Sequence, residues 1–150
     1  MVLNKDFREF IELLNEKEVK YLVVGGYAVA FHGYPRYTKD IDFWIWLNRE
    51  NARKTIEVIK EFGFSSLGLT EDDLLDSENV IQLGYPPARI DLLTDLVGID
   101  FDQCFESRSV VDINGLEVNF IDLDSLIKTK ILTDRPQDRI DAEQLEKGKE

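Results

Sequence analysis

The chain has 150 residues, a length typical of a single domain and sufficient to bury a hydrophobic core without disulfide bonds. Hydrophobic residues make up 43% of it and aromatic residues 11%, which excludes a disordered or low-complexity chain. The net charge of −12 arises in residues 63–124, where 14 acidic side chains accompany only two basic ones, Arg89 and Arg108. This balance disfavours binding to bare nucleic acid or to an anionic membrane surface through charge alone.

No apolar run approaches the roughly 20 residues that span a bilayer. The first ten residues also lack the apolar stretch of a signal peptide. The single cysteine, Cys104, excludes an internal disulfide and a cysteine-rich metal site. We therefore expect a cytoplasmic protein in which residues 1–150 form one domain.

Hydrophobic periodicity, β-branched runs and glycine or proline breaks predict the secondary structure in chain order. The expected helices are 7–14, 27–32, 51–62, 70–75, 124–133 and 136–146. The expected strands are 19–24, 41–47, 79–83, 89–94, 110–113 and 116–121. Asn114-Gly115 between the last two strands is a strong hairpin signal. Strand–helix units first and hairpins later predict an α+β fold, with a mixed β-sheet flanked by helices.

Residues 24–46 carry the most chemical information. Gly25 and Gly26 end the first strand and begin a helix, so the backbone can turn sharply and present N–H groups to a phosphate. Asp40 and Asp42 enter the next strand, where side-chain alternation places both carboxylates on one face. A divalent metal would relieve their repulsion, and Mg²⁺ prefers carboxylate oxygens together with substrate phosphates.

Asp91 is the best candidate for a third carboxylate. It is a single acidic residue in the apolar strand 89–94, where a charge is costly unless it is paired or bound to metal. Two metals held by three carboxylates stabilise the attacking and leaving oxygens of an in-line displacement. The carboxylate nearest the acceptor hydroxyl can also take its proton. The alternative interpretation of Asp91 is an ion pair with Arg89 or another cation.

Other patterns have structural interpretations. Asp100/Asp102 and Asp122/Asp124 repeat the spacing of Asp40/Asp42, but each pair precedes a helical stretch, which favours N-terminal helix caps. The only histidine, His32, is interpreted as a packed residue at a helix end rather than as a catalytic group.

Two segments resemble a known superfamily. The first resembles the signature of the polymerase-β-like nucleotidyltransferases in the pattern Gly25-Gly26-x-Ala28 … Gly33-x-x-Arg36-x-Thr38-x-Asp40-x-Asp42. It is most similar to small bacterial members, which include AbiEii/AbiGii-toxin-like proteins and lincosamide and aminoglycoside nucleotidyltransferases. The second is similar to a segment that follows the catalytic core of AbiEii-like proteins, in the pattern Lys130-x-x-x-x-Arg135-Pro136-x-Asp138-x-x-Asp141.

The resemblance implies a polymerase-β-like nucleotidyltransferase fold and a role for each matching residue. Asp40, Asp42 and Asp91 would be catalytic and would bind Mg²⁺ (two ions), with Asp91 as the base. Gly25 and Gly26 would hold the triphosphate of an NTP. The remaining implied nucleotide contacts are Arg36, Thr38, Lys130 and Arg135.

The cations among these implied contacts also have simpler interpretations. Arg36 can be a surface loop cation. Lys130 and Arg135 can be cations that interact with the C-terminal end of a helix.

We therefore expect a Mg²⁺-dependent nucleotidyltransferase that moves a nucleoside monophosphate from an NTP to a hydroxyl of an RNA, a protein or a small molecule. A toxin–antitoxin setting is one context for it, with an antitoxin or a basic protein as partner. The alternative is a non-catalytic nucleotide-binding or partner-binding module of such a pair. Most acidic residues of 63–124 would form a solvated face, which favours a cationic acceptor and makes NTP binding depend on Mg²⁺.

Overall fold

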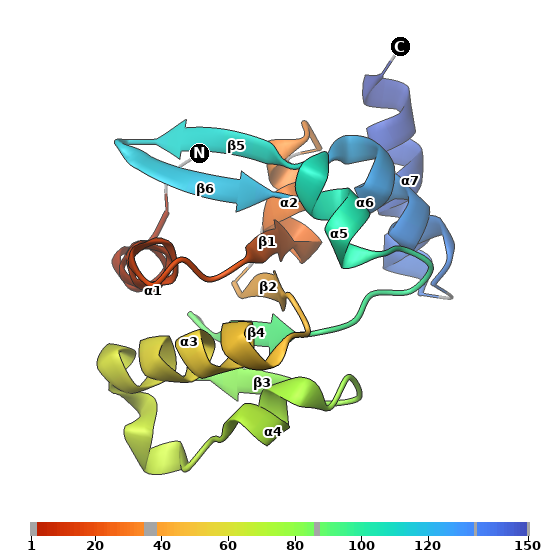
Figure 1. The fold of residues 1–150 in the computed structure, drawn as a ribbon. Coiled ribbons are helices and arrows are strands. Elements are labelled where there is room, and N and C mark those ends of the chain that lie inside the picture. Colours follow the sequence, from red (N-terminus) through yellow and green to blue (C-terminus); the bar gives the residue numbers. More distant parts are fainter. Residues whose placement is uncertain (1–2, 35–38, 86–87, 134, 150) are drawn as a thin grey trace.

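The computed structural model describes residues 3–34, 39–85, 88–133 and 135–149, which form one mixed β-sheet with helices on both faces (Figure 1). The strands are β1 (Tyr21–Val24), β2 (Ile41–Ile45), β3 (Val80–Leu83), β4 (Ile90–Leu93), β5 (Ser109–Ile113) and β6 (Leu116–Phe120). Their order across the sheet is β3-β4-β2-β1-β6-β5. β2 pairs with β4, and β1 with β6, in parallel; the other neighbours are antiparallel. The predicted α+β class is confirmed.

Seven α-helices surround the sheet in the described part of the chain. They are α1 (Lys5–Glu16), α2 (Gly25–Phe31), α3 (Arg49–Ile59), α4 (Glu71–Leu75), α5 (Phe101–Glu106), α6 (Leu123–Ile131) and α7 (Pro136–Gly148). The predicted caps are present: Asp100 accepts a hydrogen bond from the first turn of α5, and Asp122 from that of α6. These two aspartates therefore serve helix ends, as their positions in the sequence indicated.

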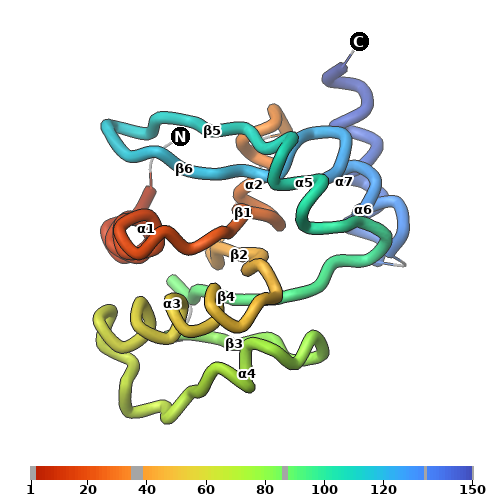
Figure 2. Tube along the Cα trace, in the orientation of Figure 1, coloured from red at the N-terminus to blue at the C-terminus, as the bar shows by residue number. Residues whose placement is uncertain are grey.

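The two faces of the sheet are buried by different helices. On one face, α1 brings Phe10 against Phe43 of β2, with ring centroids 5.4 Å apart. On the other face, Phe101 of α5 packs edge-on against Trp44, at 5.1 Å. Because side chains alternate along β2, Asp42 lies on the same face as Trp44. The tube in Figure 2 shows α6 and α7 packed side by side beyond this face.

Asn51 explains why the first two strands are shorter than predicted. Its buried side chain accepts a hydrogen bond from the backbone N–H of Lys20 (2.8 Å) and donates one to the carbonyl oxygen of Trp46 (3.0 Å). These contacts occupy backbone groups just outside the β1–β2 ladder. The ladder therefore runs from Tyr21↔Ile45 to Val24↔Asp42 instead of covering the whole apolar runs.

The other predicted helices and strands differ from the observed ones only in where they begin and end. α3 begins at Arg49, before the predicted residue 51, because Asn48 caps it. After Ile59 the chain continues as a wider helical turn over Lys60–Phe64. The hairpin at Asn114-Gly115 is confirmed: both residues have positive φ (52° and 86°), as a tight two-residue turn requires.

Candidate active site

The register of two parallel strands brings the predicted carboxylates together. β2 and β4 pair with Asp42 directly opposite Asp91, and Asp40 and Arg89 lie one step before the aligned pair Ile41↔Ile90. Asp40, Asp42, Arg89 and Asp91 therefore share one face of the sheet. Asp91 is 7% exposed and Asp42 is half-buried. The sequence predicts Asp42 and Asp91 within strands and Asp40 just before one, and the sheet makes them neighbours.

The glycine turn lies against this pair. Gly25 follows Val24, the β1 residue that pairs with Asp42, and has a φ of +67°. A Cβ atom at Gly25 would overlap the Oδ2 atom of Asp42. Glycine is required here both for its backbone conformation and because the Asp42 carboxylate approaches so closely.

The surroundings of Asp42 raise the pKa of its carboxyl group. Burial, repulsion from Asp91 and Asp40, and a hydrogen bond with Asp91 raise the pKa of Asp42 from 3.8 to about 7, although the positive charge of Lys130 opposes the shift. A carboxyl group with this pKa is partly protonated near neutral pH. A cation bound beside Asp42 would favour the ionised form.

Arg89 makes ion pairs with two of the three carboxylates. Its Nε and an Nη atom donate to the two oxygens of Asp91 at 2.8 and 3.0 Å, and the same Nη atom lies 3.0 Å from Oδ2 of Asp40. The ion pair with Arg89 that was the alternative interpretation of Asp91 is thus present. This ion pair does not exclude a role of Asp91 in the carboxylate cluster, because Asp91 contacts Arg89 and lies opposite Asp42 at the same time.

A cavity of about 570 Å³ opens over the cluster. Gly25, Gly26 and the three carboxylates line it, as do Lys130 and Arg135. The lining residues that sequence reasoning did not identify as site residues are Val24, Ser77, Asn79, Val80, Arg89, Leu93, Asp95, Leu96, Leu126, Thr129, Thr133, Gln137 and Asp138. Most of these carry no local sequence signal, because they reach the cavity through the packing of β3, β4, α6 and α7.

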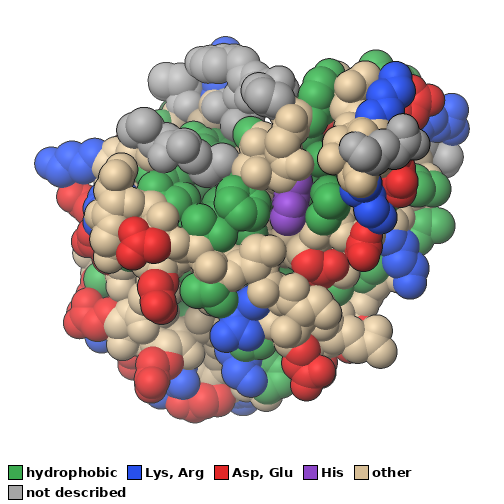
Figure 3. Space-filling model, turned by 90° about the horizontal axis from the view of Figure 1, so that it is seen from above, with side chains coloured by type: hydrophobic (Ala, Val, Ile, Leu, Met, Phe, Trp, Pro, Cys, Tyr) green, Lys and Arg blue, Asp and Glu red, His purple; other side chains and the backbone are tan. Residues whose placement is uncertain are grey.

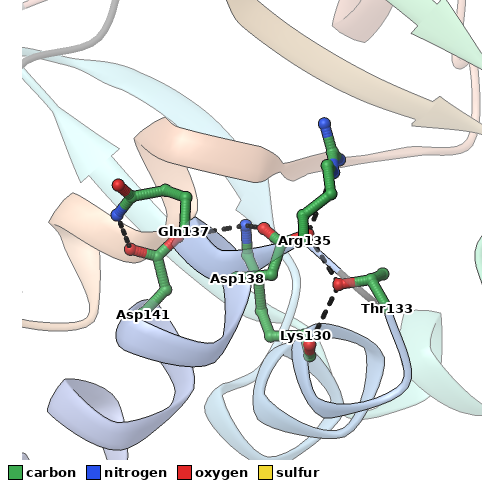
Figure 4. Close-up of polar contacts among 6 residues, drawn as sticks. All are labelled: Lys130, Thr133, Arg135, Gln137, Asp138 and Asp141. Atoms are coloured by element: carbon green, nitrogen blue, oxygen red, sulfur yellow. Dashed lines mark hydrogen bonds and ion pairs between the residues drawn. The ribbon is translucent and has the colours of Figure 1, made fainter.

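The C-terminal motif forms a polar network between α6 and α7 (Figure 4). Asp138 accepts from Lys130 at 2.8 Å, from Thr133 at 2.7 Å and from Arg135 at 3.2 Å. Burial disfavours ionisation of Asp138, but the hydrogen bonds from Lys130 and Thr133 outweigh it and lower its pKa. Lys130 also lies 3.3 Å from Asp141, which is fully buried.

This network decides between the interpretations of Lys130 and Arg135 only in part. Lys130 lies in the last turn of α6, as the helix-end interpretation requires. Its ammonium group, however, forms ion pairs with Asp138 and Asp141 of α7. The Arg135 side chain is 82% exposed beyond its ion pair with Asp138. Both residues line the cavity. The predicted contacts Arg36 and Thr38 lie outside the described residues.

His32, Trp44 and Cys104 have structural roles. A ring nitrogen of His32 lies 2.6 Å from the carbonyl oxygen of Ile121, as expected for a packed histidine. Trp44 is 2% exposed and belongs to the core. Cys104 is a free, buried thiol whose pKa is raised by burial.

The carboxylate oxygens of the cluster are the type of ligand that a hard divalent cation prefers. Asp42 and Asp91 offer adjacent carboxylate oxygens, and the absence of a side chain at Gly25 makes room for the Asp42 carboxylate. Within the described ranges, no three acidic, histidine or cysteine side chains converge tightly enough to enclose an ion. Asp40 and Asp91 are instead drawn together by Arg89.

The same fold occurs in solved nucleotidyltransferase structures. A nucleotidyltransferase structure from Thermotoga maritima matches with a TM-score of 0.61 at 16% identity, over 94% of this chain and 88% of that one. The lincosamide antibiotic adenylyltransferase LnuA, solved with lincomycin bound, matches with a TM-score of 0.57 at 14% identity, over 97% of both chains. The antibiotic-resistance factor ANT(2'')-Ia matches with a TM-score of 0.57 at 14% identity, over 93% of this chain and 80% of that one. These likenesses define a nucleotidyltransferase fold.

The family follows from the sequence itself. Residues 3–148 match the family described as nucleotidyl transferases of unknown function (DUF2204), and the chain belongs to it. The resemblance to the polymerase-β-like nucleotidyltransferases is thereby confirmed at the level of family and fold. No curated protein matches the chain. In the part of the chain that the structure describes, no helix is long and apolar enough to cross a membrane.

Proposed function

We propose that the protein is a Mg²⁺-dependent nucleotidyltransferase that transfers a nucleoside monophosphate from an NTP to a hydroxyl group and releases pyrophosphate. The observation that carries this proposal is the pair Asp42–Asp91, two carboxylates aligned on neighbouring strands beside the Gly25 turn. Such a pair is unfavourable without a bound cation or proton. It is the arrangement that binding of a metal–phosphate complex would stabilise.

Each residue then has a defined task. Asp40, Asp42 and Asp91 would hold Mg²⁺, which supplies charge stabilisation at the α-phosphate and at the two oxygens exchanged there. A carboxylate of the cluster, with Asp91 as the candidate, would accept the proton of the attacking hydroxyl. Gly25 and Gly26 present a side-chain-free backbone to the triphosphate.

The cavity has two unlike sides, which supports separate places for the two substrates. On the α6–α7 side, Arg135 exposes its guanidinium group for phosphates, beside Lys130, whose charge is shared with Asp138 and Asp141. On the β3–β4 side, the lining comprises Ser77, Asn79, Val80, Leu93, Asp95 and Leu96. Among the described lining residues, Arg89 is the one lysine or arginine of this side, and it is ion-paired with Asp40 and Asp91. We assign the NTP to the first side and the acceptor to the second.

The composition of the acceptor side favours some acceptors over others. Val80 is 57% exposed and Asp95 is exposed, so this side offers apolar surface, hydrogen-bonding groups and a negative charge. An RNA backbone would meet repulsion from Asp95, and the charge of Arg89 is already paired with Asp40 and Asp91. A hydroxylated small molecule that is neutral or cationic, or a basic protein segment, is the better match.

The test is transfer of label from NTPs labelled at the α-phosphate, with and without Mg²⁺, to an acceptor pool of RNA, protein and small-molecule fractions. Label should move in the wild type and be lost in Asp42→Asn and Asp91→Asn. Asp102→Asn is the matched control, because Asp102 belongs to another D-x-D pair and is exposed in the first turn of α5. Absence of transfer from every NTP, or unchanged transfer in Asp42→Asn, would refute the proposal.

The same experiment addresses the second candidate function. A non-catalytic module of a toxin–antitoxin pair would bind nucleotide or partner without transferring label. The co-alignment of three carboxylates favours the enzyme, because nucleotide binding alone does not require Asp91 beside Asp42. We place the enzyme in the cytoplasm, where NTPs and Mg²⁺ are available, and leave an antitoxin as a partner to be tested by co-purification.

A further inference from the structure

Arg89 forms part of the carboxylate cluster rather than of the surrounding surface. It lies directly before β4, opposite Asp40 across the β2–β4 pair, and the next residues on the same face are Asp42 opposite Asp91. The face therefore has one rung of opposite charges next to one rung of like charges. Like charges directly opposite each other destabilise a sheet, and a neighbouring cation offsets this repulsion.

The contacts of Arg89 use the fork geometry of a guanidinium group. Two nitrogens engage both oxygens of Asp91, at 2.8 and 3.0 Å, and one of them also reaches Asp40 at 3.0 Å. A bidentate contact fixes the plane of the Asp91 carboxylate as well as its position. The lysine ammonium group is a point charge and cannot reproduce that orientation.

The charges of the cluster also match a divalent ion. With all three carboxylates ionised, the four side chains carry −3 from the aspartates and +1 from Arg89, a net charge of −2. The Arg89 side chain is 25% exposed and lines the cavity, so it remains beside any ion that enters. We propose that Arg89 is a positioning residue that orients Asp40 and Asp91 toward a divalent metal held with Asp42. This inference rests on the proposed metal-dependent function.

Mn²⁺ binding without nucleotide tests this role directly. Free Mn²⁺ is measured by electron paramagnetic resonance for the wild type, Arg89→Gln and Arg89→Lys. Loss of a group that orients metal ligands typically weakens metal binding about 10–100-fold. We expect a loss of that size in Arg89→Gln and a partial recovery in Arg89→Lys, which restores the charge but not the fork.

Arg53→Gln is the matched control. Arg53 also pairs with two carboxylates, Glu50 and Glu57, but on the exposed surface of α3, so its Mn²⁺ affinity should equal that of the wild type. Thermal unfolding of each variant establishes that it is folded, and Arg89→Lys remains informative if Arg89→Gln is not.

The outcomes separate the two proposals. Unchanged or tighter Mn²⁺ binding in Arg89→Gln would overturn the positioning role, since Arg89 would then be neutral or a competitor of the metal. No Mn²⁺ binding by the wild type would overturn the proposed metal-dependent function, and the role of Arg89 with it.

Discussion

The carboxyl group of Asp42 is held where its ionised form is disfavoured. Its pKa is about 7 in the folded protein, against 3.8 without burial and neighbouring carboxylates. Because the folded-state pKa is the higher one, the protonated group contributes stability that is fully present below about pH 4. That contribution is lost as the pH rises from there through about 7. The site thus costs stability at neutral pH when no cation is bound.

Replacing Asp42 by asparagine should therefore stabilise the metal-free protein while abolishing transfer. We expect the free energy of unfolding in urea to rise by about 1–3 kcal/mol at pH 8, and by less at pH 5.5, where the carboxyl group is already protonated. Urea unfolding with EDTA at the two pH values measures this difference. An equal change at both pH values would show that the ionisation of Asp42 is not responsible.

Metal binding should depend on pH through the same group. A proton and a cation compete for the Asp42 carboxylate, so Mn²⁺ affinity should increase between pH 6 and pH 8 and level off above the pKa of about 7. Calorimetric titrations across this range measure the trend. A flat profile would mean that Asp42 is ionised throughout or does not contact the metal.

At the scale of elements, the β1–α2 junction depends on Gly25. Gly25→Ala combines an unfavourable positive φ with overlap of the new Cβ and the Asp42 carboxylate. We expect the free energy of unfolding to fall by about 1–3 kcal/mol because of the unfavourable backbone conformation alone. We also expect a severe loss of transfer activity, because Asp42 would be displaced. Urea unfolding and label transfer measure the two effects.

Gly33→Ala provides the comparison for this junction. Gly33 also has a positive φ (109°), but a Cβ there meets nothing within 4 Å. It should share the backbone penalty and keep its transfer activity. If Gly25→Ala behaved like Gly33→Ala in both measurements, close approach to Asp42 would not be the reason for the glycine.

The α6–α7 pair should depend on the contacts of Lys130. Removing its charge leaves buried Asp138 and Asp141 without that partner, so Lys130→Met should lower the free energy of unfolding by about 2–4 kcal/mol. The double variant with Asp141→Asn should recover part of this loss, because it removes a buried charge. Urea unfolding of the single and double variants measures the coupling, and strictly additive losses would contradict it.

At the scale of the whole molecule, the charge of −12 affects nucleotide binding. Acidic and basic side chains are interspersed on the face seen from above (Figure 3), so the imbalance is not concentrated there. Without a divalent metal, an NTP approaches a protein of like charge, and salt screens that repulsion. NTP binding in EDTA should thus be weak and should strengthen from about 0.05 to about 0.3 M salt.

Fluorescence titration with a labelled NTP measures this salt dependence. Binding that instead weakens steeply with salt would indicate that Lys130, Arg135 and other cations dominate the encounter. Addition of Mn²⁺ should increase the affinity at every salt concentration.

Local signals predicted most of the elements. The capping position of Asp122, the Asn114-Gly115 turn and the periodicity of α1 each act over a few residues, and each is present in the structure. The predicted ends of β1 and β2 were wrong because Asn51 of α3 forms hydrogen bonds with the backbone groups that adjoin these strands. Such a contact has no local signature.

For the candidate site, the sequence by itself determined what alternation and backbone geometry require: Asp40 and Asp42 on one strand face, after a turn that only glycine can make. The tertiary structure alone decided which residues meet there. Asp91 lies beside Asp42, and Arg89 beside Asp40, because β2 and β4 pair in parallel in one particular register. That register joins segments far apart in the chain and is set by packing of the whole sheet, so no local pattern encodes it.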